Sequence, residues 1–226
     1  MATPFYVAPE QMMKDRAEYA RKGIARGRAL VAIEYVDGVV FVGENPSRLL
    51  YKTSEIYDRI AFAAVGKYNE FESLRVAGIR LADVKGYQYG RDDVTGKSLA
   101  NAYSQALGAI FMGDGKPYEV ELLIAQVDGG ESALDLFHIL YDGSIVDEQD
   151  VVAIGGESDR LTEIMRQGFT TGMDLTTAIR LGRDALGEIA ERPIPASDLE
   201  VSGLDRTRPR RRFFRIQEPQ VAEMLG

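Results

Sequence analysis

The 226-residue sequence has no cysteine, no tryptophan and a single histidine, His138. Without cysteine, the chain has no disulfide framework, no thiolate nucleophile and no cysteine-ligated zinc or iron–sulfur site. A single histidine excludes metal sites with several histidine ligands and makes any Ser-His-Asp triad depend on His138. We therefore expect no metal site, no cofactor and a reducing, cytoplasmic location.

Positive charge and long apolar runs are also scarce. The 27 lysines and arginines are outnumbered by 35 acidic residues, for a formal net charge of −8, which argues against general binding to nucleic-acid phosphates or anionic lipid. No run approaches the roughly 18 apolar residues that a membrane span requires. Apolar residues make up 45% of the chain, as in ordinary globular proteins. We predict neither a nucleic-acid nor a membrane partner.

Helical and strand patterns alternate along the chain. Pro9 is typical of a helix start, and Gly23 is the expected end of that helix. Further helices are predicted in two pairs. The first pair has its apolar positions over 71–81, after Asn69, and over 99–110, after Thr95 and Gly96; the second pair begins at about Ser158 and after Asp174. A short helix over 219–225 closes the chain. The predicted strands are residues 29–35, 39–43, 59–65, 118–127, 134–141, 151–154, 199–204 and 212–216.

This order predicts the fold class. Asp37-Gly38 and Asp142-Gly143 are typical of tight turns between antiparallel strands. Because helices follow the strands in pairs, we expect an α+β fold, a four-layer αββα sandwich of two antiparallel sheets. No linker-like run divides the chain, so residues 1–226 are predicted to form one domain. Residues 1–8 carry no continuing pattern and are predicted to be an arm.

Short stretches spread along the chain form a set that is found together in one family. They are Pro9-Glu10-Gln11, Glu18-Tyr19-Ala20-Arg21, residues 38–42, 44–48 and 66–71, Lys52 ahead of Ile56-Tyr57, and Asp93-Val94-Thr95-Gly96. The set resembles a proteasome α subunit, most closely of the actinobacterial type, over nearly the whole chain to about Arg215. The resemblance implies an N-terminal-nucleophile hydrolase type of fold and a place in the outer, non-catalytic heptameric ring of a bacterial proteasome core.

The resemblance also implies that this chain has no catalytic residue. Proteasome-type proteases use a threonine at the first position, whose own amine serves as the base. Similarity to the β subunits of the same family puts the nucleophile position near Arg28, the paired acid near Glu44 and the catalytic lysine near Glu55-Ile56. Arginine is no nucleophile, and neither Glu55 nor Ile56 carries positive charge. The threonine endopeptidase activity is therefore expected on a partner β subunit.

Two alternatives to this interpretation stay open. The first is a self-processed N-terminal-nucleophile hydrolase that acts alone; Thr3 is the only threonine near the start, and Pro4 follows it. The second is a ring scaffold with no proteolytic partner. An intact or Met-trimmed N-terminus in mass spectrometry excludes the first, and co-purification with a threonine-protease subunit excludes the second.

Two segments are expected to act in ring assembly and gating. By resemblance, the helix over residues 9–23 packs between neighbouring subunits, although its stripe can instead pack only on its own subunit. Its predicted ring contacts are Met13, Ala17, Tyr19, Ala20 and Ile24. The arm is expected to gate the axial pore through Thr3, Pro4, Phe5, Tyr6, Val7 and Ala8. The Tyr-Asp-Arg triplet of archaeal and eukaryotic gates occurs here only at residues 57–59.

Lys52 is the residue expected to bind a partner. In similar proteins, a lysine at the matching position meets the C-terminal carboxylate of an activator tail, in a pocket between adjacent α subunits. The other walls of this pocket are expected to be Glu18, Gly66, Lys67 and Tyr68. The implied activator is a regulatory AAA ATPase or another ring activator, and the implied substrates are unfolded proteins in transit.

A basic run near the C-terminus has two interpretations. It consists of Arg206, Arg208, Arg210, Arg211, Arg212 and Arg215, with Phe213 and Phe214 among them. Such a run is compatible with nucleic-acid contact. On an acidic chain without another basic motif, a solvated edge strand or a subunit contact is the favoured interpretation.

Overall fold

The computed structural model describes residues 8–47, 49–128 and 134–226. The helices in these ranges are α1 (Pro9–Ala25), α2 (Tyr68–Gln88), η1 (Arg91–Asp93), α3 (Gly96–Met112), α4 (Ser158–Gly168), α5 (Leu175–Ile189), η2 (Ala196–Asp198) and α6 (Glu218–Leu225). The strands are β1 (Leu30–Tyr35), β2 (Gly38–Glu44), β3 (Thr53–Tyr57), β4 (Ile60–Gly66), β5 (Val120–Val127), β6 (Leu134–Ile139), β7 (Ile145–Glu148), β8 (Val151–Ile154), β9 (Leu199–Asp205) and β10 (Phe213–Ile216).

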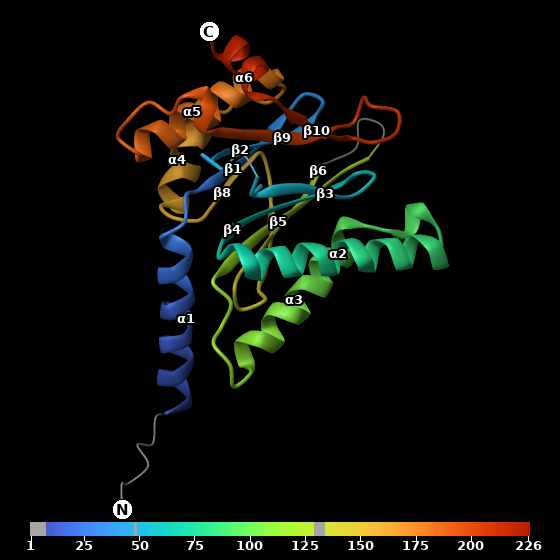
Figure 1. The fold of residues 1–226 in the computed structure, drawn as a ribbon, viewed down its shortest axis with the longest axis vertical. Coiled ribbons are helices and arrows are strands. Elements are labelled where there is room, and N and C mark those ends of the chain that lie inside the picture. The colour runs from blue at the N-terminus through green and yellow to red at the C-terminus, as the bar shows by residue number, and fades with distance from the viewer. Residues whose placement is uncertain (1–7, 48, 129–133) are drawn as a thin grey trace, which may run out of the picture.

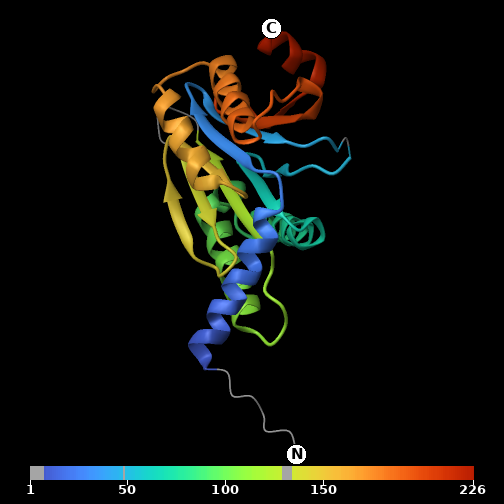
Figure 2. The same cartoon turned by 90° about the vertical axis from the view of Figure 1, so that its left-hand side faces the viewer.

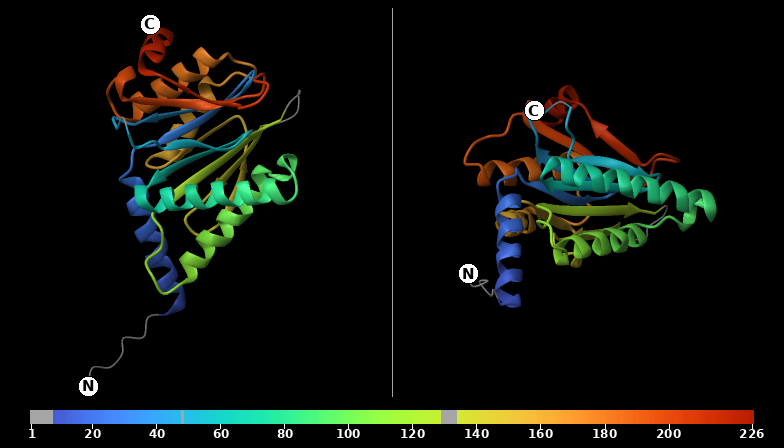
Figure 3. Two further views of the ribbon diagram at one scale, coloured as in Figure 1. Left: turned by 45° about the vertical axis from the view of Figure 1, so that its right-hand side comes forward. Right: turned by 60° about the horizontal axis from the view of Figure 1, so that its bottom comes forward.

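The strands form two five-stranded antiparallel sheets. The first sheet has the order β10-β9-β2-β1-β8, and the second has the order β3-β4-β5-β6-β7. Tyr35 pairs with Gly38, which confirms the predicted turn at Asp37-Gly38. Helices α4 and α5 cover the first sheet, and α2 and α3 cover the second (Figures 1 and 3). The predicted αββα class is confirmed.

Three apolar layers hold this sandwich together. One lies between the sheets and includes Phe41, Val65 and Leu123, which are fully or almost fully buried. A second lies under α4 and α5, and a third lies under α2 and α3. Because β2 and β4 bury side chains on both faces, their sequences are nearly continuous apolar runs.

Strands β3 and β7 were absent from the sequence-based prediction. They are the two edge strands of the second sheet. An edge strand pairs with only one neighbouring strand, and part of its surface is exposed to solvent. It therefore needs little of the alternation of apolar and polar residues by which a strand is predicted from sequence. β3 carries Thr53, Ser54 and Glu55, and Ile145 and Val146 of β7 are exposed.

Helix α1 continues to Ala25, past the predicted end at Gly23. The side chain of Glu119 fills the space beside Gly23 that a larger residue would take. The helix extends away from the two sheets, and Arg16 near its middle donates to the carbonyl oxygens of Phe111 and Ile110 at 2.8 and 3.2 Å, at the end of α3. The C-terminal end of the helix packs against the sheets (Figure 2). Ala20 and Ile24 are buried there in the layer between the sheets. The prediction that these two side chains contact a neighbouring subunit is therefore wrong, because their own chain covers them.

The arginines around the β9–β10 connection form ion pairs within the chain. These pairs are Arg206–Glu34 (3.9 Å), Arg208–Asp205 (3.7 Å), Arg211–Glu55 (2.6 Å) and Arg215–Glu200 (2.8 Å). Phe213 and Phe214 are buried. Four of the six arginines are thus neutralised within the chain. Arg215 lies on the edge strand β10, and the other five lie in the connection that precedes it.

The Tyr57-Asp58-Arg59 triplet forms the turn between β3 and β4. Asp58 pairs with Arg91 at 2.6 Å, and Arg59 pairs with Asp128 at 2.9 Å. These contacts tie η1 to the sheet.

Within the described ranges, no helix combines the length and the apolarity that crossing a bilayer demands.

His138 lies between two carboxylates. Its Nε2 is 3.8 Å from Glu121 Oε2, and its Nδ1 is 3.6 Å from Glu148 Oε1. Burial alone would lower the pKa of His138, but the two glutamates raise it to about 9. The protonated ring therefore joins β5, β6 and β7.

The ion pairs of His138 predict a pH-dependent stability. Protonated His138 stabilises the fold fully below the ordinary pKa of 6.5, and this contribution is lost as the pH rises through about 9. We expect the difference in unfolding free energy between the wild type and His138→Gln to shrink over that interval. Urea unfolding at a series of pH values measures it. A difference that stays constant from pH 6 to pH 10 would contradict the assigned pairs.

Candidate functional site

A pocket of about 220 Å³ opens where β1, β2, β4 and α2 come together. Three of the five predicted activator-binding residues, Lys52, Gly66 and Tyr68, line it together. Its other lining residues are Gly27, Arg28, Glu44, Asn45, Ser47, Leu50, Val65 and Phe71. The pocket thus combines one amine, an ion pair and several apolar or aromatic walls.

Hydrogen bonds hold both the half-buried amine and the backbone carbonyl group of Lys52. Its Nζ donates a hydrogen bond to the carbonyl oxygen of Arg28 at 2.6 Å. Its own carbonyl oxygen accepts from the amide of Ala64 in β4 at 2.9 Å. Burial lowers the pKa of Lys52 to about 8, and the cation of Arg28 acts in the same direction, against the carboxylates of Glu200 and Glu44.

An ion-pair cluster lies beside Lys52. The carboxylate of Glu44 is buried and lies 3.0 Å from Arg28 Nε and 2.5 Å from Arg192 Nη2. The two arginine side chains are about half exposed. Since one carboxylate balances two guanidinium groups and Lys52 adds a third cation, the pocket carries excess positive charge and suits an anionic ligand.

The predicted catalytic positions hold structural groups. Arg28 and Glu44 form the ion pair described above, and Glu55 pairs with Arg211 at 2.6 Å. Ile56 is buried in the layer under α2. The lysine that lies beside Arg28 is Lys52, which the sequence analysis connected only with the activator pocket. Ser47, the serine that lines the pocket, accepts hydrogen bonds through its hydroxyl oxygen from the amides of Leu49 and Leu50 at 3.4 and 3.1 Å.

Gly66 and Lys67 shape the turn into α2. Gly66 has φ +105°, and the amide of Lys67 donates to the carbonyl oxygen of Glu119 at 2.9 Å. Lys67 does not line the pocket; its amine lies 4.0 Å from the buried carboxylate of Glu70. Glu70 also pairs with Lys116 and accepts from the amide of Glu119 at 2.7 Å. Lys67 is therefore part of the pocket's support.

Glu18 lies apart from this pocket in the single chain. It is exposed on α1 and pairs with Lys22 at 2.6 Å, and this lysine lowers its pKa. Elsewhere on α1, Met12 and Tyr19 are exposed beside Pro117 and Lys116, around a hollow of about 380 Å³. Met12, which the sequence analysis passed over, is more accessible than the half-buried Met13 and Ala17.

Of the predicted gate residues, only Ala8 lies in the described ranges, where it is exposed immediately before α1. Thr3, Pro4, Phe5, Tyr6 and Val7 lie outside the described residues.

Comparison with known proteins shows the family to which this chain belongs. Residues 24–202 match the sequence profile of the family described as Proteasome subunit. The chain belongs to the proteasome subunit family. Three relatives named proteasome subunit alpha match it over its entire length: that of Nocardioides sp. is 55% identical over 90% of its own length, that of Kineococcus radiotolerans 54% over 99%, and that of Streptomyces griseus 56% over 85%. The predicted resemblance to actinobacterial proteasome α subunits is confirmed.

Gly66 offers a test of the pocket geometry in this proteasome-family chain. A Cβ at residue 66 would overlap the carbonyl oxygen of Glu119, and its φ of +105° strains any L side chain. We expect Gly66→Ala to destabilise the chain by about 1–3 kcal/mol or more, measured as a lowered thermal unfolding midpoint. In the control Gly115→Ala, the new Cβ has no atom within 4 Å, so the midpoint should not change. Equal midpoints for both variants would contradict the described turn.

Proposed function

We propose that this chain forms the outer, non-catalytic ring of a bacterial proteasome core particle in the cytoplasm. In this proposal it templates the assembly of the catalytic β ring, limits access to unfolded protein chains, and docks a regulatory AAA ATPase or another ring activator. The observation that carries the proposal is the Lys52 pocket, in which an amine, a surplus of positive charge and apolar walls meet in a chain of the proteasome subunit family.

The pocket suits the C-terminal carboxylate of a protein tail. Lys52 supplies a charged hydrogen-bond donor, and Leu50, Tyr68 and Phe71 supply apolar surface for the last side chain of the tail. A charge-assisted hydrogen bond contributes roughly 1.5–3 kcal/mol, which is too little to hold a large activator through one tail. Several tails on one ring raise the effective concentration, so that weak single sites give firm docking.

Exposed apolar side chains support assembly with other subunits. Met12 and Tyr19 are exposed on α1, and Leu81, Val84 and Tyr87 are exposed along α2. Exposed apolar patches commonly mark interaction sites between proteins. We assign the α1 surface to contacts between copies of this chain, with Met12 added to the predicted residues Met13, Ala17 and Tyr19. Glu18, which lies on α1, then reaches the activator pocket of a neighbouring copy.

The first test is Lys52→Ala in the assembled core particle. Loss of the ammonium group should abolish the stimulation of peptide hydrolysis by a ring ATPase, because each docked tail loses its charge-assisted bond. Size-exclusion chromatography should show the same assembly as the wild type. Lys97→Ala, which removes an exposed lysine away from the pocket, is the control and should retain stimulation. Full stimulation of Lys52→Ala would remove Lys52 from the docking site.

The second test removes residues 1–8. If this arm obstructs the axial pore, the truncated core particle should hydrolyse small fluorogenic peptides faster than the wild type without any activator. The rate at the active sites should be unchanged, as measured by covalent labelling of the catalytic threonine. An unchanged rate of peptide hydrolysis would mean that the arm does not limit access.

A further inference from the structure

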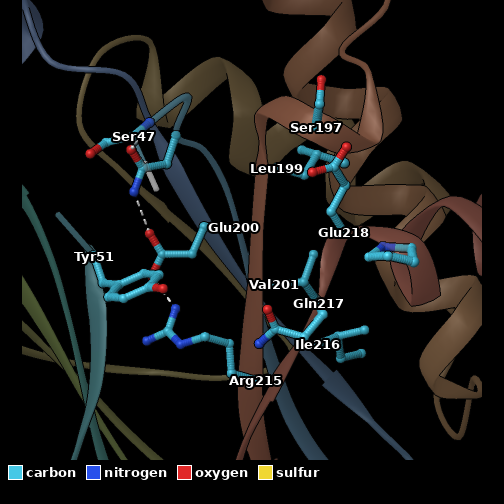
Figure 4. Close-up of a pocket in the computed structure, with 12 residues that line it drawn as sticks. Ser47, Tyr51, Ser197, Leu199, Glu200, Val201, Arg215, Ile216, Gln217 and Glu218 are labelled. Carbon is cyan, nitrogen blue, oxygen red and sulfur yellow. Dashed lines mark hydrogen bonds and ion pairs between the residues drawn. The ribbon is translucent and has the colours of Figure 1, made fainter. Parts of the chain in front are cut away.

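Glu200 of β9 lies behind the chain segment that carries Lys52. We define the pocket segment as residues 45–47 and 49–53, between β2 and β3. Asn45 and Ser47 line both the Lys52 pocket and a second cavity of about 280 Å³, so the segment separates the two. Glu200 lines the second cavity (Figure 4). Only 4% of its side chain is exposed.

The carboxylate of Glu200 holds both ends of the pocket segment. At one end, Asn45 Nδ2 donates to Oε2 at 2.6 Å. At the other end, the amide of Lys52 donates to Oε2 at 2.9 Å and the amide of Thr53 donates to Oε1 at 3.0 Å. The Thr53 hydroxyl adds a further bond at 2.5 Å. Two successive amides that point to one carboxylate fix the orientation of the peptide group at Lys52.

Lys52 thereby joins the two sheets. Its amide is held by Glu200 of the first sheet, and its carbonyl oxygen accepts from Ala64 of the second sheet. Its side chain then leaves this fixed backbone toward the carbonyl oxygen of Arg28. A backbone fixed from both sides limits the positions that the amine can reach.

Arg215 completes the support behind the segment. Its Nη1 lies 2.8 Å from Glu200 Oε1, and its Nη2 donates to the carbonyl oxygen of Thr53 at 2.7 Å. Its guanidinium carbon is 3.9 Å from the centre of the Tyr51 ring (Figure 4). Although burial acts to raise the pKa of Glu200, the hydrogen bonds from Lys52, Thr53 and Arg215 lower it below its ordinary value. Glu200 is therefore ionised at neutral pH.

We propose that Glu200 is a positioning residue for Lys52, which orients the lysine through its backbone amide and favours the protonated amine through its negative charge. The proposal rests on the docking function proposed above. In this proposal, the buried Glu200, which is 148 positions from Lys52 in the sequence, controls both the position and the charge of the Lys52 amine. This amine is the group that binds the carboxylate of the docking tail.

The charges around the Lys52 amine determine what the loss of Glu200 does. Glu200 on β9 and Glu44 on β2 favour the ammonium form, whereas Arg28 ahead of β1 opposes it. Arg192 is paired with Glu44, and Arg215 is paired with Glu200. From α2, the pocket lining receives Tyr68 and Phe71. Neutralising Glu200 removes one of the two favourable carboxylates, so the pKa of Lys52 falls further below about 8.

The test measures carboxylate binding by the assembled ring across pH 6–9. The ring is captured on a surface that carries the peptide acetyl-Gly-Ser-Gly-Ser-Leu with a free carboxylate, and the amidated peptide gives the background. We expect wild-type binding to decline as the pH rises through about 8. In Glu200→Gln, this decline should move to lower pH by about half a pH unit, which roughly halves the charged fraction of each site at pH 8.

The control is Glu121→Gln, which neutralises a largely buried carboxylate that pairs with His138 and accepts from the amide of Gly155. It should keep the wild-type pH profile. A decline in Glu200→Gln that keeps the wild-type midpoint would overturn the proposal, because a purely structural loss weakens binding at every pH alike. If Glu200→Gln does not assemble, Glu200→Gln/Arg215→Met removes both charges of the buried pair. The lost arginine charge offsets part of the lost carboxylate charge, so the midpoint should move to lower pH by less than in the single variant, and an unmoved midpoint would overturn the proposal.

Failure of the docking function itself gives a different result. If wild type and Lys52→Ala bind the free-acid surface equally, or if acid and amide surfaces capture the wild type equally, the proposed function fails and the role of Glu200 fails with it. If Lys52→Ala loses binding while Glu200→Gln keeps both the affinity and the pH midpoint of the wild type, the docking function stands and only the positioning role is overturned.

Discussion

Face-to-face packing of the two sheets is the constraint on which the rest of this structure depends. The central strands bury side chains on both faces, between the sheets and under the helix pairs. Each outer face must therefore be covered by helices, and each edge strand can be short and polar. The same packing clamps the end of α1 through Ala20 and Ile24, so that the remainder of this helix extends outward from a fixed base (Figure 1).

The candidate site lies where strand ends of the two sheets meet. Glu44 ends β2, Gly66 ends β4, and Glu200 follows the first residue of β9, directly opposite Gly43 of β2. Lys52 precedes β3 and hydrogen-bonds to both sheets. A site of this kind is rigid because its parts belong to the most buried elements of the fold. Its amine is nevertheless accessible, since the strands diverge into connecting segments at this edge.

By the resemblance described above, the nucleophile position of β subunits is expected near Arg28, which in this chain belongs to an ion-pair cluster. Arg28 and Glu44 pair with each other, and the carbonyl oxygen of Arg28 accepts from Lys52. Lys52 thus lies beside Arg28, where its amine donates to a backbone oxygen and lines a pocket that suits an anion. The same strand ends support the proposed docking of a carboxylate.

The sequence alone determined the αββα class, the family, and the order of the helices and strands apart from the two edge strands β3 and β7. These follow from local patterns: apolar periods of 3.6 and 2, Asp-Gly turns, and motifs a few residues long. It also assigned Lys52, Gly66 and Tyr68 to one site, and these three residues line one pocket. Only the tertiary structure decided which side of α1 faces inward, because Ala20 and Ile24 form the same kind of stripe whether their own chain or another covers it. Only it revealed Glu200, since hydrogen bonds between residues so distant in the chain leave no local pattern.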